Sequence, residues 1–174
     1  TPLGIQSFDQ QVFEVKQDHP KEKAMLVVEG KETIGIQFID TEYLFDKRKG
    51  LVSIQVNDEE ILKQAPKPIF YRALTDNDRG AKQTYANWLN ASLFQNVVGF
   101  KMIRNSKCAQ MIYTIQLESI EEECKLVYTV YNNQSIQIQL HLDKNSQRQT
   151  LPLFGIEFAL KEEFKNFAYF GKGE

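Results

Sequence analysis

Strict alternation of apolar and polar residues in the second half of the chain limits the fold more than any other feature. In the segment 136–142, Ile, Ile, Leu and Leu alternate with Gln, Gln and His, and the same period of two occurs in 111–117 and 126–130. A period of two places the apolar side chains on one face of a strand. Turn residues such as Asn132-Asn133 separate these segments. Short strands at this spacing predict an antiparallel β-sandwich, because a sheet with one apolar face needs a second layer to cover it.

The first half of the chain carries the same signal. Ile34, Ile36 and Phe38 alternate with smaller or polar residues, which indicates a half-buried strand. Two further apolar segments, 43–45 and 51–56, are separated by five residues that end in a glycine. This spacing predicts a β-hairpin.

One segment breaks the β pattern and predicts a helix. Tyr85, Trp88, Leu89 and Leu93 recur at intervals of three and four residues, which is the spacing of an amphipathic helix. We therefore expect one substantial helix near 82–94. Its apolar stripe should pack on a sheet, with Trp88 buried.

The most distinctive polar residues lie between the predicted strand at 69–71 and this helix. Arg72 is followed by Asp76-Asn77-Asp78, residue types that favour turns, and then by Gly80, which can supply a positive φ. The planar guanidinium matches a carboxylate in pairs, so Arg72 is expected to bond Asp76 or Asp78. Residue types alone favour a structural clasp over a ligand site and leave both readings open.

Charge and composition exclude several classes of function. The 174 residues contain 21 basic and 23 acidic residues, interspersed, for a net charge of −2. This balance predicts neither nucleic-acid binding nor attraction to a membrane surface. No apolar run is long enough to span a bilayer, and no signal peptide opens the chain. We expect a cytoplasmic protein.

Metal sites and disulfides are not expected either. His19 and His141 have no cysteine or histidine at ligand spacing. A calcium loop of the EF-hand type starting at Asp76 would need a glutamate at its twelfth position, where Asn87 stands. Cys108 and Cys124 are expected to be buried thiols in a reducing compartment.

At the level of motifs, nearly the whole chain resembles the fifth, C-terminal domain of bacterial β-galactosidases of glycoside hydrolase family 2. The most specific resemblance is the block Tyr71–Gly80, an aromatic-Arg-Ala run that ends in Asp-Asn-Asp and a glycine. Supporting blocks are 45–53, 56–62, Leu151–Ile156 and Tyr169–Gly173. The chain departs from the family at Leu153, where arginine is usual, and at Glu174, where proline is usual.

The resemblance implies a domain organisation. Residues 1–17 resemble the exit strand of a preceding immunoglobulin-like domain, and residues 18–174 resemble the N-terminal part of a galactose-mutarotase-like supersandwich. We expect this sandwich to be truncated. An unpaired sheet edge should then produce self-association or local disorder near Gly171, because exposed edges pair with other chains.

The resemblance also implies a function. Members of the family hydrolyse terminal β-D-galactosides with retention, using two glutamates and metal ligands on a (β/α)₈ barrel. No part of this chain resembles that barrel, so we assign it no catalytic residue, no metal site and no cofactor, and expect it to be inactive alone. By resemblance, Asp76, Asn77, Asp78, Arg79 and Gly80 lie near the substrate in the intact enzyme. Residues 79–84 would form a loop that shifts as the sugar moves deeper into the site. The barrel and the galactoside are the expected partners.

Two alternatives remain open at this stage. One is a freestanding carbohydrate-binding sandwich, with Tyr43, Trp88 and Tyr131 as candidates for an aromatic sugar platform. The other is a purely structural domain that supports subunit assembly.

Overall fold

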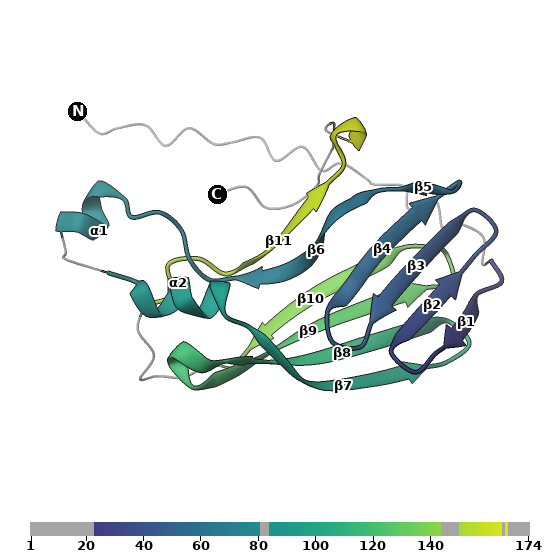
Figure 1. The fold of residues 1–174 in the computed structure, drawn as a ribbon, viewed down its shortest axis with the longest axis horizontal. Helices are drawn as coiled ribbons and strands as arrows, with labels where there is room; N and C mark the ends of the chain where they lie inside the picture. The colour runs from purple at the N-terminus through teal and green to yellow at the C-terminus, as the bar shows by residue number, and fades with distance from the viewer. Residues whose placement is uncertain (1–22, 81–83, 144–149, 165, 167–174) are drawn as a thin grey trace, which may run out of the picture.

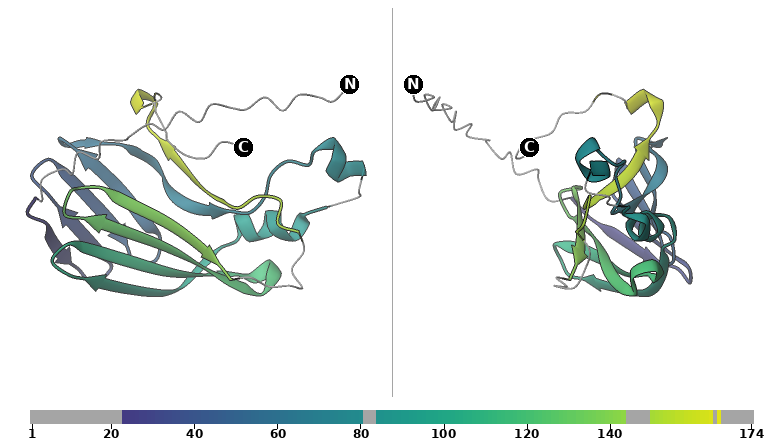
Figure 2. Two further views of the ribbon diagram at one scale, coloured as in Figure 1. Left: turned by 180° about the vertical axis from the view of Figure 1, so that it is seen from behind. Right: turned by 90° about the vertical axis from the view of Figure 1, so that its left-hand side faces the viewer.

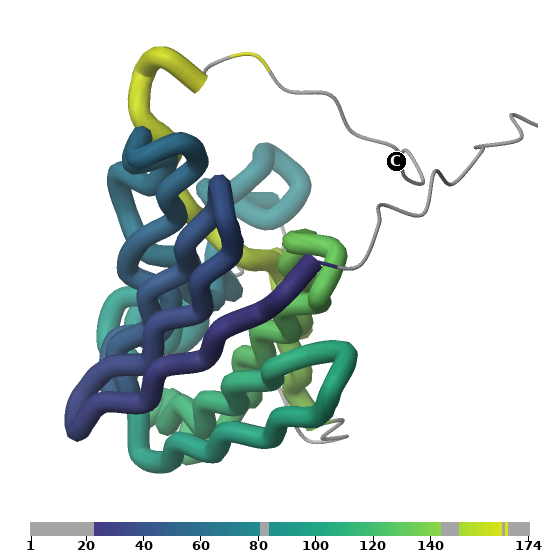
Figure 3. Tube along the Cα trace, turned by 90° about the vertical axis from the view of Figure 1, so that its right-hand side faces the viewer, coloured from purple at the N-terminus to yellow at the C-terminus, as the bar shows by residue number. Residues whose placement is uncertain are grey.

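The protein is an antiparallel β-sandwich, as the sequence predicts. The computed structural model describes residues 23–80, 84–143, 150–164 and 166. Two sheets lie face to face, and two short helices lie together at one end of them (Figure 1). Figure 3 shows the two layers from one end.

The first layer is a five-stranded sheet with the order β1-β2-β3-β4-β5. Its strands are β1 (Leu26–Glu29), β2 (Thr33–Gln37), β3 (Thr41–Asp46), β4 (Gly50–Val56) and β5 (Glu59–Glu60). Strands β3 and β4 form the hairpin that the sequence predicts, with Tyr43 opposite Ile54. Ile34, Ile36 and Phe45 are fully buried, so the alternating positions of this sheet face the second layer.

The second layer is a four-stranded sheet with the order β10-β9-β8-β7. It consists of β7 (Asn96–Arg104), β8 (Cys108–Leu117), β9 (Glu122–Tyr131) and β10 (Ile136–Leu142), with the short 3₁₀ helix η1 (Glu118–Ile120) between β8 and β9. Along β8 the buried and half-buried residues alternate without exception. Met111, Tyr113 and Ile115 therefore face the core, while Gln110, Ile112 and Thr114 face outward.

A two-stranded pair carries the chain from the sandwich to the helical end. Strand β6 (Leu62–Ile69) pairs with β11 (Gly155–Leu160), which is followed by the 3₁₀ helix η2 (Glu162–Phe164). Helices α1 (Asp76–Gly80) and α2 (Ala86–Leu93) follow β6. Figure 2 shows from behind that both helices lie at the end of the molecule where β11 begins.

Aromatic rings join the two layers in the core. Phe45 of the first sheet contacts Tyr128 of the second, with ring centroids 5.5 Å apart. Tyr128 contacts Tyr113, which contacts Phe100, at 5.7 and 5.0 Å. The hydroxyl of Tyr113 donates to the Asp46 carbonyl at 3.0 Å, and that of Tyr128 donates to the Pro66 carbonyl at 3.3 Å. Both buried hydroxyls thus have hydrogen-bond partners, as most buried polar groups do.

The β3–β4 turn needs its glycine for two reasons. Gly50 has a φ of 88°, a conformation that side chains rarely adopt. A Cβ at this position would also lie 3.2 Å from the Tyr128 hydroxyl oxygen. The glycine therefore lets the hairpin approach the aromatic core.

The predicted helix is shorter than expected and its apolar stripe is only partly buried. Helix α2 covers Ala86–Leu93, so the expected start at residue 82 is wrong, and Tyr85 precedes the helix with a left-handed φ of 46°. Trp88 is fully buried, as predicted, and its ring centroid lies 6.0 Å from that of Phe70. Leu93 is 61% exposed, however, and Ala91 faces the core instead. The difference arises because the helix ends at Leu93 and the chain turns into β7.

Several expectations lie outside the described residues. These are the exit strand at 1–17, the loop residues 81–83, and the disorder or self-association near Gly171.

Replacing Trp88 tests the docking of α2. We expect Trp88→Ala to lower the free energy of unfolding by about 3–5 kcal/mol, the usual cost of truncating a fully buried aromatic side chain. Leu93→Ala, in the same helix but largely exposed, should change it by less than about 0.5 kcal/mol. Chemical denaturation measures both. Equal effects of the two substitutions would show that α2 is not docked through Trp88.

Candidate functional site

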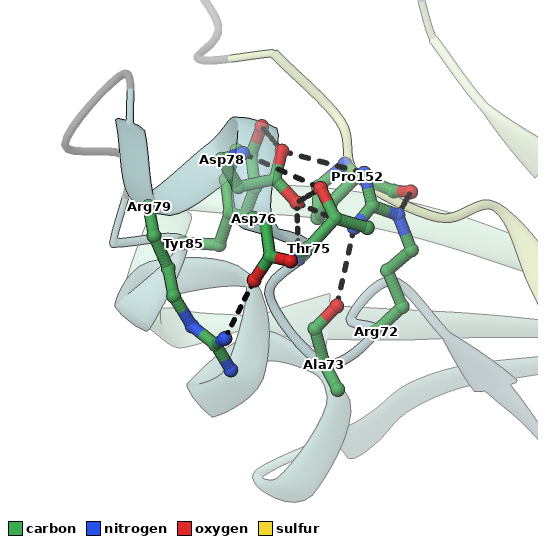
Figure 4. Close-up of polar contacts among 8 residues, drawn as sticks. All are labelled: Arg72, Ala73, Thr75, Asp76, Asp78, Arg79, Tyr85 and Pro152. Atoms are coloured by element: carbon green, nitrogen blue, oxygen red, sulfur yellow. Dashed lines mark hydrogen bonds and ion pairs between the residues drawn. The ribbon is translucent and has the colours of Figure 1, made fainter.

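The candidate site lies at the helical end, where the chain leaves β6 and forms α1 (Figure 4). The sequence predicts a turn at Asp76-Asn77-Asp78, and this prediction is wrong. The chain forms a five-residue helix, α1, whose third residue is Asp78, and local hydrogen bonds explain why.

A reciprocal pair of hydrogen bonds starts α1. The backbone N–H of Thr75 donates to the Asp78 carboxylate at 2.8 Å, and the backbone N–H of Asp78 donates to the Thr75 hydroxyl at 3.3 Å. The Thr75 hydroxyl also donates to the same carboxylate at 2.7 Å. This arrangement is a capping box, with aspartate in the place usually held by glutamate. A helical turn therefore replaces the predicted turn because its first N–H groups are satisfied.

Arg72 connects this cap to a distant part of the chain. Its Nη1 donates to Asp78 Oδ2 at 2.6 Å, and its Nη2 donates to Oδ1 at 3.4 Å. Of the two acidic partners expected for Arg72, the structure selects Asp78. The Nε of Arg72 donates to the carbonyl of Pro152 at 3.1 Å, across a separation of 80 residues. Arg72 therefore has a distant partner in addition to the acidic partner that the sequence predicts.

Tyr85 completes the cluster from the other side of α1. Its hydroxyl donates to Asp78 Oδ1 at 3.2 Å, and the side chain is buried. Burial and the neighbouring carboxylate both raise the pKa of Tyr85, so it stays a neutral donor. Its left-handed backbone is uncommon for a residue with a bulky side chain. We refer to Arg72, Thr75, Asp78 and Tyr85 as the Asp78 cluster.

These contacts hold Asp78 in its ionised form. Hydrogen bonds from Arg72 and then from Thr75 lower the pKa of the Asp78 carboxyl far below its usual range, and they outweigh the opposite effect of burial. A general acid needs a pKa near the working pH. Asp78 is therefore suited to fixing geometry and not to transferring protons.

The other expected site residues face water. Asp76 and Arg79 form a pair at 3.0 Å, but their side chains are 98% and 67% exposed, so the pair contributes little to stability. Asn77 and Gly80 are also exposed. The segment Asp76–Gly80 thus has one buried anchor, and its remaining residues are available to a partner.

Gly80 does not have the conformation that the sequence analysis expects. It is the last residue of α1, and among the described glycines only Gly50 has a positive φ. No atom lies within 4 Å of where a Cβ would be built on Gly80. The expected turn with a positive φ is therefore absent, and alanine fits the space at this position.

The described residues contain no group of three or more His, Cys, Asp or Glu side chains that could hold a metal ion. This part of the chain therefore has no set of ligands that would fit the cations implied by the resemblance. Cys108 and Cys124 are free, and burial raises the pKa of the Cys124 thiol to about 12. Neither α1 nor α2, nor any other helix within the described ranges, is long and apolar enough to cross a membrane.

The fold and the site define the class of this domain: it is an all-β sandwich with a polar segment anchored at one end. Comparison with known proteins identifies the family. A family profile described as "Beta galactosidase small chain" matches residues 38–174, and the chain belongs to this family.

Its relatives include longer enzymes and a separate subunit. The chain is 31% identical to a β-galactosidase of Clostridium acetobutylicum, an alignment that covers 96% of this chain and 19% of that protein. It is 31% identical to a β-galactosidase of Streptococcus thermophilus, with 93% and 16% covered. It is 25% identical to a β-galactosidase small subunit of Latilactobacillus sakei, with 86% and 54% covered. The chain thus spans less than a fifth of these long relatives and about half of the small subunit.

Sequence reasoning found Arg72 and Asp78 but missed Thr75, Tyr85 and Pro152. The spacing of Thr75 and Asp78 is a recognisable capping-box signal and could have predicted the short helix. The contact with Pro152 has no local signal, because it depends on how β11 returns to β6.

Acid titration tests the ionised state of Asp78. A carboxyl group whose pKa is lowered in the folded state stabilises the fold above its unfolded pKa of about 3.9 and loses this effect as the pH falls. We expect Asp78→Asn to be less stable than wild type at pH 7, and the difference to shrink below about pH 4. Asp40 and Glu60, whose pKa values are also lowered, are present in both proteins. Denaturation curves measured against pH check this, and a constant difference across the range would contradict it.

Removing Arg72 tests the connection between α1 and the sheet. Arg72→Ala leaves the buried Asp78 carboxylate without its cation and the Pro152 carbonyl without its donor, so we expect the melting temperature to fall by several degrees. The matched control is Arg79→Ala, which removes an exposed ion pair in the same helix and should leave the melting temperature unchanged. Similar losses in both variants would show that the Asp78 cluster has no special role.

Proposed function

We propose that this chain is a non-catalytic β-sandwich part of a β-galactosidase that hydrolyses terminal β-D-galactosides with retention. In this proposal the exposed residues of α1 lie at the edge of the active site in the intact enzyme. The observation that carries the proposal is the family match over 38–174, which includes the whole Asp78 cluster. This supports the proposal because residues that contribute to a site are often carried on connecting segments that a rigid scaffold positions.

Hydrolysis with retention requires two catalytic carboxylates, and we propose that this chain supplies neither of them. A retaining glycosidase uses one carboxylate as nucleophile and one as acid and base, about 5 Å apart. Asp78, the buried carboxylate of the candidate site, is bonded by Arg72, Thr75 and Tyr85 and has a lowered pKa. We therefore assign both catalytic groups, and the cations of the family, to a larger catalytic chain or domain.

The larger catalytic part is the partner that we propose. The relative from Latilactobacillus sakei is named a small subunit, while the other two relatives are long single chains. Both arrangements fit a sandwich that works beside a separate catalytic body. Free thiols at Cys108 and Cys124 fit a cytoplasmic location.

The alternative function, a carbohydrate-binding sandwich, would need an exposed aromatic platform. The three candidate rings, all among the described residues, do not form one. Tyr43 is buried and donates its hydroxyl to the Gln134 carbonyl at 2.7 Å, and Trp88 is fully buried. Tyr131 is half-buried and donates to Gln137 at 2.9 Å. These rings lie in different environments and do not present a shared flat surface.

The isolated chain should not hydrolyse galactosides. We expect no turnover of a chromogenic β-galactoside by the purified 174-residue chain, and turnover by the full-length protein that contains it. The control is the chain prepared from a host that lacks its own β-galactosidase. Activity that stays with the pure chain would overturn the assignment of catalysis to another part.

Gly80→Ala in the full-length enzyme tests the role of α1 at the active site. Alanine fits the space at Gly80 but reduces backbone freedom where α1 leads into residues 81–83. We expect a measurable change in kcat or KM, because substitutions at hinge positions often change both constants, with a melting temperature that is unchanged or slightly raised. Gly35→Ala is the matched control, because it also meets no atom within 4 Å but lies in β2. Kinetic constants that match wild type would place α1 away from the substrate.

A further inference from the structure

A second candidate site lies on the outer face of the four-stranded sheet, away from α1. This face is turned to the viewer in the left view of Figure 2, and no described helix or strand covers it. It contains an open hollow with a volume of about 700 Å³, a size within the range of small-molecule pockets. We call it the outer groove.

The strand register arranges the outer groove in three rows across the sheet. The central row has Ile112 opposite Val127 in its middle, with Lys101 and Gln139 at its ends. Val127 points away from the core and yet is only 8% exposed, so the middle of the groove is recessed. The rows on either side consist of Gly99, Thr114, Lys125 and His141, and of Ile103, Gln110, Thr129 and Gln137.

Several polar side chains of the groove have hydrogen-bonding capacity that no neighbouring side chain takes up. Gln110 Nε2 donates to the Thr129 hydroxyl at 3.1 Å, which leaves the Gln110 carbonyl oxygen as an acceptor. The side chains of Thr114, Gln139 and His141 have no hydrogen-bond partner within the described part of the chain.

Glycine at position 99 keeps the Thr114 hydroxyl accessible. A Cβ on Gly99 would lie 3.3 Å from Thr114 Cβ and 3.4 Å from its hydroxyl oxygen. Residues on β7, β8 and β10 therefore present donors and acceptors around an apolar floor, with little competition from one another.

The groove has an apolar centre surrounded by hydrogen-bonding side chains, an arrangement that matches the shape and chemistry of a sugar ring. Its lining also includes Lys101, Lys125, His141 and Asp143. A pyranose has a face of C–H groups and a circumference of hydroxyl groups, each of which is both a donor and an acceptor. We propose that the outer groove binds a neutral saccharide, with one ring over Ile112 and Val127 and its hydroxyl groups bonded to Thr114, Gln139 and Gln110. This site is additional to the proposed function and includes no catalytic step.

The affinity should be modest. The proposed floor consists of aliphatic side chains, so the added attraction of an aromatic ring is missing. The groove is also open on one side, so much of a bound ring stays hydrated. A dissociation constant in the millimolar range is therefore expected.

Nuclear magnetic resonance of the ¹⁵N-labelled 174-residue chain tests the proposal, with methyl β-D-galactopyranoside as the probe. We expect saturable shifts of backbone amides in the three rows of the groove. Thr114→Val and Gln139→Ala each remove one partner and should weaken binding about two- to tenfold. The matched control is Gln64→Ala, an exposed glutamine on β6 in the two-stranded pair, which should leave the affinity unchanged.

Three results would overturn the proposal. The first is the absence of saturable shifts in the groove, with all variants folded as judged by unchanged spectra elsewhere. The second is a response of the same amides to inorganic phosphate and not to the glycoside, which would make Lys101 and Lys125 an anion site. The third is a dependence of these amides on protein concentration without sugar, which would identify another copy of the chain as the occupant.

Discussion

The carboxylate of Asp78 is the point on which the helical end of the molecule depends. It is largely removed from water and receives hydrogen bonds from Arg72, Thr75 and Tyr85. Each donor comes from a different part of the chain. Arg72 follows β6, Thr75 caps α1, and Tyr85 directly precedes α2. An anion in this environment is stable only while its donors are in place, because an unpaired buried charge is costly. The position of α1 is therefore fixed by electrostatics and not by an apolar contact of its own.

The sandwich supplies the rigid base for this cluster. Trp88 of α2 packs against Phe70, the residue that follows β6, and the Phe70 backbone N–H donates to the Ser92 hydroxyl at 2.9 Å. Arg72 then ties the α1 cap to Pro152, just before β11. The result is a short helix whose inner face is held at several points and whose outer residues remain exposed. This division between a fixed base and an exposed surface is what the proposed role beside a catalytic barrel requires.

The sequence predicted the features that depend on local periodicity. Alternation in 111–117 and 136–142 was sufficient for the antiparallel sandwich, and the spacing of Trp88 within its helix was sufficient for its burial. The pairing of Arg72 with an acidic residue followed from the geometry of the guanidinium group. The choice of Asp78 over Asp76 did not, because it depends on the capping box with Thr75.

Features that depend on distant contacts or on rare backbone conformations were not predictable. The Arg72–Pro152 bond requires β11 to return beside β6, which no short pattern encodes. Tyr85 has a left-handed backbone conformation, so α2 begins only at Ala86 and is shorter than predicted. Nothing in a tyrosine side chain suggests this conformation. The exposure of Leu93 follows from its place at the end of α2, where the chain turns into β7.

Amide hydrogen exchange in Arg72→Lys tests most directly whether Arg72 holds the cluster together. Lysine keeps the charge but cannot bond two carboxylate oxygens and the Pro152 carbonyl at once. The account predicts faster exchange at the amides of Thr75 and Asp78, with the protection of β8 and β9 unchanged. Wild-type protection at Thr75 and Asp78 in this variant would contradict it, since the α1 cap would then form without the guanidinium fork.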